Sequence, residues 1–208
     1  MKIFFLAFTL LTFLGANAQD DINDTRKKNE GFAKVSQKDL RADLATFTLS
    51  GIDESIGKSE LQKIAFTSSG ANFMTFEGDD IKATVAIAPF DPSKHKLDYD
   101  EKTLIKIDKK TYYGGYGAVP KTVISNVTLV IGKDSVAIPS VAYFDLYNLN
   151  FTYKDKGTQR TRNAVYKSKD GHKIYLYLLC KDKTGNYEVT WIFQDKKYLR
   201  RVLDYGFL

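Results

Sequence analysis

The sequence predicts an all-β protein, either an antiparallel β-sandwich or a partly closed barrel, with room for one or two short N-terminal helices. Short runs rich in β-branched and aromatic residues recur roughly every dozen residues through the C-terminal two thirds of the chain. Turn residues such as "EGDD", "GKD" and "KDG" separate these runs. Several runs also alternate apolar and polar side chains, which is the pattern of a strand with one buried face.

The first eighteen residues are typical of a secretory signal peptide. Lys2 gives a positive start, residues 3–14 form a twelve-residue apolar run, and residues 16–18 ("ANA") supply the small side chains that signal peptidase accepts. The run is shorter than the roughly 20 apolar residues that span a bilayer. We therefore expect cleavage before Gln19 and export to the periplasm or the extracellular space.

The mature chain is expected to be soluble and not a lipoprotein, because no second spanning segment and no cysteine near the cleavage point appear in the sequence. Cleavage leaves 208 − 18 = 190 residues, which suits one domain. The stretch after Gln19 is polar and charged. We expect a disordered or extended lead over residues 19–39 and a single β-sandwich-like domain over residues 40–208.

A short helix is expected over residues 36–47, "SQKDLRADLATF", with Ser36 as its N-cap. The apolar residues that would share one face of this helix are Leu40, Leu44 and Phe47. The alternative is that residues 44–50 already form a strand. Residues 53–66 have the same ambiguity between helix and strand.

Strand signals dominate from there on. Residues 72–90 contain two β-rich runs around "EGDD", which predicts a hairpin, and residues 102–113 offer another candidate strand. Residues 123–131 and 135–138 flank the tight turn "GKD".

The last third predicts a four-strand antiparallel meander, formed by "RNAVYKS", "HKIYLYLLCK", "YEVTWIFQ" and "YLRRVLDYGF". Residues 173–181 are apolar on both faces, so this strand should be central and covered on both sides. In residues 187–194, Trp191 lies on the apolar side of the predicted strand, whereas the other side is mostly polar. We expect a half-buried strand with Trp191 in the main core.

Residues 168–207, together with residues 107–122 ("IDKKTYYGGYGAVPKT") and 138–153 ("IPSVAYFDLYNLNFTY"), resemble a group of uncharacterised secreted β-rich proteins from Bacteroidetes-type bacteria. The resemblance implies an exported bacterial β-protein. It transfers no catalytic residue and no ligand.

Several chemistries have little support in the sequence. Cys180 is the only cysteine, so no intrachain disulfide is expected and a small buried hydrophobe is the favoured role. His95 and His172 are the only histidines, and no Cys/His cluster accompanies them, so no zinc site is expected. The net charge of +6 is dispersed along the chain, and nucleic acid is not an expected partner. No cofactor is expected.

Asp98, Asp100 and Glu101 in "LDYDEK" are weak candidates for calcium ligands, because calcium binds several carboxylate and carbonyl oxygens. The stretch does not match the twelve-residue EF-hand loop. Surface carboxylates are the favoured interpretation, and no metal site is expected.

The stretch "TYYGGYGAVP" supplies the candidate ligand-binding residues, which are Tyr112, Tyr113 and Tyr116. Tyrosine combines apolar area with a polar tip, and the interleaved glycines allow left-handed backbone conformations. One interpretation is an exposed stacking platform. The favoured interpretation is a turn, in which the glycines bend the chain and the tyrosines cover the core.

We expect a non-enzymatic binding or envelope-assembly module, whose partner would be a glycan or another envelope protein. The alternative is a glycan- or peptide-directed hydrolase. Such an enzyme would place two carboxylates about 5–10 Å apart in a cleft.

Export is tested by N-terminal sequencing of the protein recovered outside the cytoplasm of its bacterial host. The first residue should be Gln19 or lie very near it, because the small residues at positions 16–18 mark the cleavage point. Recovery of the full-length chain from the cytoplasm alone would contradict the prediction.

Overall fold

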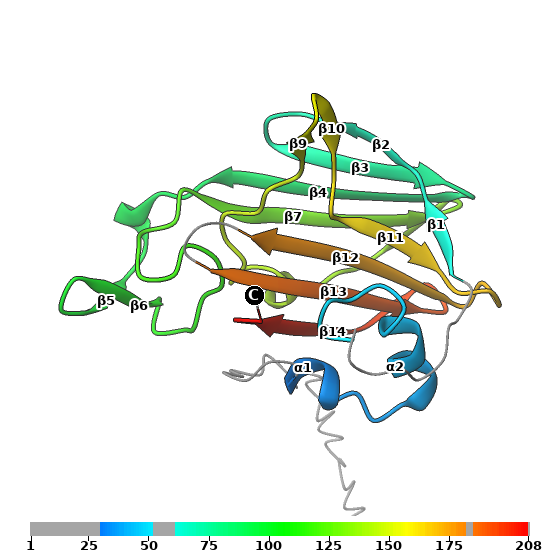
Figure 1. The fold of residues 1–208 in the computed structure, drawn as a ribbon, viewed down its shortest axis with the longest axis horizontal. Helices are drawn as coiled ribbons and strands as arrows, with labels where there is room; N and C mark the ends of the chain where they lie inside the picture. Colours follow the sequence, from blue (N-terminus) through cyan, green and yellow to red (C-terminus); the bar gives the residue numbers. More distant parts are fainter. Residues whose placement is uncertain (1–29, 52–60, 182–184, 208) are drawn as a thin grey trace, which may run out of the picture.

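The computed structural model describes residues 30–51, 61–181 and 185–207, which form two antiparallel five-stranded sheets around a shared core (Figure 1). The first sheet has the order β1-β11-β12-β13-β14. Its strands are β1 (Gln62–Ile64), β11 (Ala164–Lys167), β12 (Lys173–Lys181), β13 (Asn186–Gln194) and β14 (Lys197–Tyr205). The second sheet has the order β2-β3-β4-β7-β8. Its strands are β2 (Phe66–Ser69), β3 (Phe73–Gly78), β4 (Ile81–Pro89), β7 (Thr122–Ile131) and β8 (Asp134–Val136). The expected antiparallel sandwich is confirmed.

Short hairpins and helical segments complete the described part of the fold. Two hairpins stand apart from the sheets: β5 (Leu97–Asp100) with β6 (Thr103–Ile107), and β9 (Tyr153–Asp155) with β10 (Thr158–Arg160). The helical segments are α1 (Glu30–Ala33), α2 (Lys38–Leu44) and the 3-10 turns η1 (Pro92–Lys94) and η2 (Ser140–Ala142). Among the described residues, no helix has both the length and the apolar composition needed to cross a bilayer.

The main core lies between the two sheets, as the alternating pattern predicts. Val189, Trp191 and Phe193 of β13 point into it and are almost fully buried. The indole Nε1 of Trp191 donates a 2.8 Å hydrogen bond to the carbonyl of Ala142, which satisfies the one polar atom that this burial brings inside. Cys180 is buried in the same core, so its predicted role as a small hydrophobe is confirmed.

The predicted strand connections are also observed. Strands β11 to β14 follow one another in the sheet and form the expected meander. "EGDD" turns β3 into β4, with Asp79 and Asp80 in the left-handed region, and "GKD" turns β7 into β8. Of the candidate strand at residues 102–113, only β6 is a strand. In the described part of residues 53–66, the strand alternative holds.

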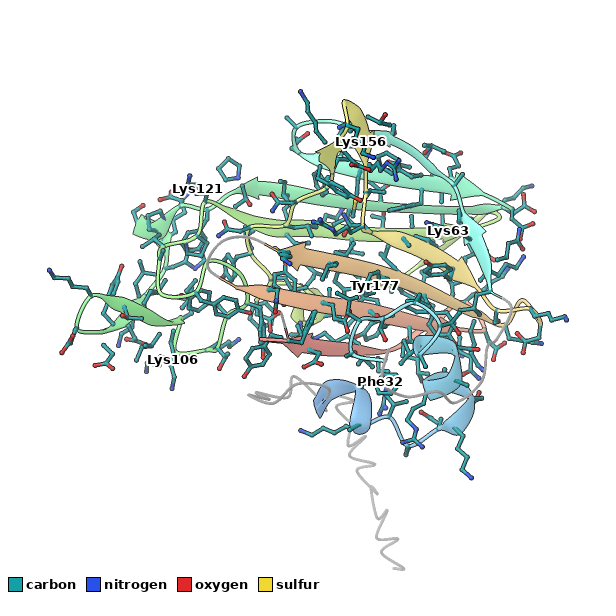
Figure 2. The ribbon with its side chains drawn as sticks, viewed as in Figure 1. Phe32, Lys63, Lys106, Lys121, Lys156 and Tyr177 are labelled. Carbon is teal, nitrogen blue, oxygen red and sulfur yellow. The ribbon has the colours of Figure 1, made fainter. Side chains whose placement is uncertain are left out.

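The N-terminal segment, residues 30–50, covers the outer face of the first sheet, and this corrects two predictions. Phe32 and Val35 are buried against that sheet, so the packed domain begins before residue 40 and residues 30–39 are not a disordered lead. Figure 1 shows α1 and α2 beside β14 and β13, and Figure 2 labels Phe32 there. Since Ile192 packs in the same cluster, β13 is buried on both faces rather than half-buried.

The helix at residues 38–44 forms without the predicted cap. Gln37 occupies the N-cap position, and its side chain makes no capping hydrogen bond, so Ser36 is not the cap. The apolar face nevertheless holds, because Leu40 and Leu44 are buried against the sheet. Residues 45–50 form turns, and the alternative of a strand over residues 44–50 is wrong. The predicted signal peptide lies outside the described residues.

A buried carboxylate fastens this N-terminal segment to the sheet. Glu188 on β13 accepts hydrogen bonds from the backbone N–H groups of Leu49 (2.9 Å) and Ser50 (2.8 Å) and from the hydroxyl of Tyr177 (2.7 Å). Burial, together with the nearby Glu188 charge, raises the pKa of Tyr177 above its ordinary value, so this phenol stays protonated and donates. The polar face of β13 thus binds the backbone of residues 49–50.

Candidate functional site

The tyrosine-glycine loop, residues 112–119, begins inside the domain. Tyr112 and Tyr113 are 5% and 0% exposed. The hydroxyl of Tyr112 donates to the Leu104 carbonyl (3.0 Å) and accepts from the Gly117 N–H (3.1 Å), which closes the loop on itself. Neither side chain is exposed enough to act as a surface stacking group, which favours the turn interpretation.

The position of Tyr113 depends on a segment more than thirty residues away. Its backbone N–H donates to the carbonyl of Asp145 (2.9 Å), and its carbonyl accepts from the N–H of Tyr147 (2.8 Å). Asp145 is itself held by Arg201 of β14 through two 2.7 Å hydrogen bonds, and both side chains are buried. A buried bidentate ion pair therefore fixes the partner segment against which the tyrosine-glycine loop lies.

Tyr116 is the one partly exposed tyrosine of the three, and it is also engaged. Its hydroxyl donates a 3.2 Å hydrogen bond to the carbonyl of Asn186, and its ring stacks on Tyr205 with centroids 6.4 Å apart. A Cβ on Gly185 would collide with the ring. The side chain thus packs against the ends of β13 and β14, which favours the turn interpretation.

Two glycines of the loop are required by close approach. Gly114 and Gly115 have φ of 99° and 75°, in the left-handed region. A Cβ on Gly114 would meet the carbonyl oxygen of Tyr147, and one on Gly115 would meet the side-chain amide of Asn148. The glycines therefore let this loop lie directly against residues 147–148.

An open cleft of about 590 Å³ lies beside this loop, at the end of the sandwich where β4 finishes and β7 starts. Lys121, which lines the cleft, is labelled in Figure 2. The described residues that line the cleft are Gly70, Ala71, Ile87, Gly115, Ala118, Val119, Lys121, Thr122, Asn148, Leu149, Asn150, Phe151 and Thr152. Four chain segments meet here, and their meeting could not be predicted because they are distant along the chain.

Asn148 joins two walls of the cleft. Its backbone is left-handed, with φ of 53°. Its Oδ1 accepts from the N–H groups of Lys121 (2.8 Å) and Thr122 (3.3 Å), and its own N–H donates to the Thr122 carbonyl (3.0 Å). Asparagine tolerates this conformation better than most residues, and the three bonds preform the cleft.

The chemistry of the cleft is that of a binding surface. Among the described lining residues, Lys121 is the only ionisable one, and the rest offer apolar groups, amides, hydroxyls and backbone. Pockets that bind ligands commonly combine an apolar lining with a few fixed polar groups, in volumes of about 300–1,000 Å³. The arrangement can orient a ligand, but these residues supply no acid–base pair.

The calcium candidates do not gather into a site. Asp98, Asp100 and Glu101 lie along the β5–β6 hairpin, and the Nζ of Lys96 lies 3.8 Å from the Asp98 carboxylate. No three His, Cys, Asp or Glu side chains of the described residues are placed to hold a metal ion. The strand register shifts between Asp98 and Tyr99, and Glu101 lies in the turn with a left-handed backbone, so the three carboxylates do not follow one regular strand face.

Each histidine instead pairs with an aspartate that sequence analysis did not identify. His95 Nδ1 lies 2.7 Å from Asp108, and His172 Nδ1 lies 2.7 Å from Asp195. These hydrogen bonds lower the pKa of both aspartates, and the bond to Asp195 raises the pKa of His172. None of the four residues lines the cleft beside the tyrosine-glycine loop. Each pair joins residues that are well separated along the chain, so the sequence alone did not indicate it.

Comparison with known proteins adds no relative. No family model matches the chain, and neither the curated proteins nor the solved structures give a match.

The role of Gly115 is tested by substitution with alanine. Gly115→Ala should lower the free energy of unfolding by about 2 kcal/mol, because it adds a Cβ to a left-handed residue and forces it against Asn148. Chemical denaturation measures the loss.

Gly157 provides the matched control, since its φ is 85° and a Cβ there would meet nothing within 4 Å. Gly157→Ala should cost about 1 kcal/mol, the backbone component alone. If the two variants lose equal stability, the close approach of Gly115 to Asn148 contributes nothing.

Proposed function

We propose that the protein is an exported, non-enzymatic binding module of a bacterial envelope, and that the cleft beside the tyrosine-glycine loop is its ligand site. The observation that carries the proposal is the cleft itself: an open concave space of about 590 Å³ with a mixed apolar and polar lining. Its walls come from loops at one end of a rigid two-sheet frame. Loops on a rigid scaffold are where binding sites concentrate.

Fixed geometry at the cleft supports binding. Asn148 bridges two walls, and the Arg201–Asp145 pair holds the segment on which the tyrosine-glycine loop rests. A preformed site loses little conformational entropy when a ligand enters. The sequence features that favour export are compatible with this role. A chain with one buried cysteine forms no intrachain disulfide, so its folding outside the cytoplasm does not depend on one.

The alternative of a hydrolase has less support. Glu188 and Asp204 are register partners on β13 and β14, and both are buried. The Glu188 carboxylate, however, is occupied by Leu49, Ser50 and Tyr177 beneath the N-terminal segment. Neither acid lines the cleft beside the tyrosine-glycine loop. A carboxylate pair needs access to substrate to act on a glycosidic bond.

The proposal is tested by blocking the cleft in the mature protein and screening it on glycan and peptide arrays. Val119→Trp should abolish retention of any ligand that the unaltered protein retains, because Val119 is 39% exposed and lines the cleft. Its melting temperature should stay unchanged, since the side chain is on the surface.

Val141→Trp is the matched control, because Val141 has nearly the same exposure, 38%, and does not line the cleft. This variant should keep full retention. Binding that survives in Val119→Trp would contradict the assignment of the cleft, and cleavage of an arrayed glycan or peptide would favour the hydrolase.

A further inference from the structure

We propose that the ligand of the cleft is an extended acidic peptide segment, which pairs its backbone with residues 149–152. The inference rests on the proposed function and adds the chemical class of the ligand. It is carried by two independent observations: the N–H groups of four residues in one wall donate to no described part of the chain, and several cations around the wall have no carboxylate partner among the described residues.

The wall formed by residues 149–152 has an unusual hydrogen-bond pattern. The structure places these residues outside any strand, and none of their four N–H groups donates to any part of the chain that it describes. Leu149 and Phe151 are nevertheless only 4% and 7% exposed. Backbone N–H groups in such a position are nearly always paired, so a wall of this kind is suited to receive carbonyl groups from outside.

The segment is also held in place without using these donors. Asn163 donates its side-chain amide to the carbonyls of Asn150 (3.2 Å) and Phe151 (3.0 Å), and Thr161 donates its hydroxyl to the Phe151 carbonyl (2.7 Å). The Oδ1 of Asn163 accepts in turn from Leu179 of β12 (3.1 Å). The carbonyls of Asn150 and Phe151 are thus held by side chains, of which Asn163 also bonds to the first sheet, and this anchoring uses none of the N–H groups of residues 149–152.

Burial alternates along the segment as it does in an edge strand. Leu149 and Phe151 pack into the main core, whereas Asn150 is exposed and Thr152 is partly exposed. An extended peptide laid beside such a segment gains main-chain hydrogen bonds from its backbone and specificity from alternate side chains. The chain continues from this segment directly into β9, so a peptide paired with residues 149–152 lies in line with that strand.

Charge around the cleft favours an acidic partner. Lys121 lines the cleft, and Lys154, Lys156 and Arg162 lie on or just beyond the β9–β10 hairpin that leads from it (Figure 2 labels Lys121 and Lys156). None of these four cations forms an ion pair with a carboxylate of the described residues, whereas Arg160 pairs with Asp155. Arg162 instead lies over the ring of Tyr153, 4.2 Å from its centroid.

A peptide fits this wall better than a glycan does. Sugar rings are commonly held by exposed aromatic faces. Among the described lining residues, Phe151 is the only aromatic one, and it is nearly buried. Alternate N–H groups of an extended segment face the same edge, and their spacing matches that of alternate carbonyls of an extended peptide.

The test is an NMR titration of the mature protein with an acetylated, amidated hexapeptide of alternating threonine and glutamate. The amide signals of Leu149 to Thr152 should shift, and their hydrogen exchange should slow on binding. A depsipeptide of the same sequence, in which esters replace alternate amides, should bind about tenfold more weakly, because an ester carbonyl accepts a weaker hydrogen bond than an amide carbonyl does.

Matched variants separate the charge from the fold. Lys121→Gln should weaken binding about two- to fivefold at low salt, the range of an exposed ion pair. Lys106→Gln, on the β5–β6 hairpin, should leave the affinity unchanged.

An oligogalacturonate with the same number of carboxylates, the trimer, distinguishes a peptide from an acidic glycan. Shifts at residues 149–152 with the peptide and none with the oligogalacturonate support the inference. Shifts with the oligogalacturonate alone would overturn the peptide inference and leave the cleft as a binding site. The absence of shifts with both at millimolar concentration would also overturn it, and the array screen with Val119→Trp then decides separately whether the cleft binds anything.

Discussion

Two-sided burial of β12 and β13 is the constraint on which the rest of the structure depends. The inward side chains of these strands fill the core between the sheets, and Tyr175 and Ile192 on the opposite face are fully buried as well. A sheet with two such faces needs a cover on each, since exposing either would leave apolar area in water. The second sheet covers one face, and residues 30–50 cover the other.

The polar residues of the outer face determine how the N-terminal cover attaches. Glu188 accepts three hydrogen bonds, two of them from the backbone of residues 49–50. Tyr175 donates to the carboxylate of Asp43 on α2, and Lys173 forms an ion pair with Asp39 at 2.5 Å. Buried polar groups require partners, so these contacts specify one placement of the segment on the sheet. The cleft lies away from this cover, at the end of the sandwich where β4 finishes and β7 starts, and none of residues 30–50 lines it.

Local patterns were sufficient to predict the sandwich, the C-terminal meander and the burial of Trp191 and Cys180, because alternation and turn residues act over short distances. The cover was missed because Phe32 and Val35 follow a polar stretch and lie in or beside one-turn helices with weak periodicity. The burial of Tyr112 and Tyr113 depends on pairing with residues 145–147, and the cleft on four distant segments. Contacts of that range leave no signature in one sequence.

Amide hydrogen exchange in a Glu188→Gln variant tests the two-sided account most directly. The substitution replaces one acceptor oxygen with an NH₂ group that faces an N–H donor, so the cover loses one of its two backbone hydrogen bonds to residue 188 while the inner core keeps its contacts. Protection of Leu49, Ser50 and the amides of α2 should fall by about tenfold or more, consistent with the loss of a buried charged hydrogen bond, and protection in β3 and β4 should change little. Unchanged protection of Ser50 and α2 would contradict the account.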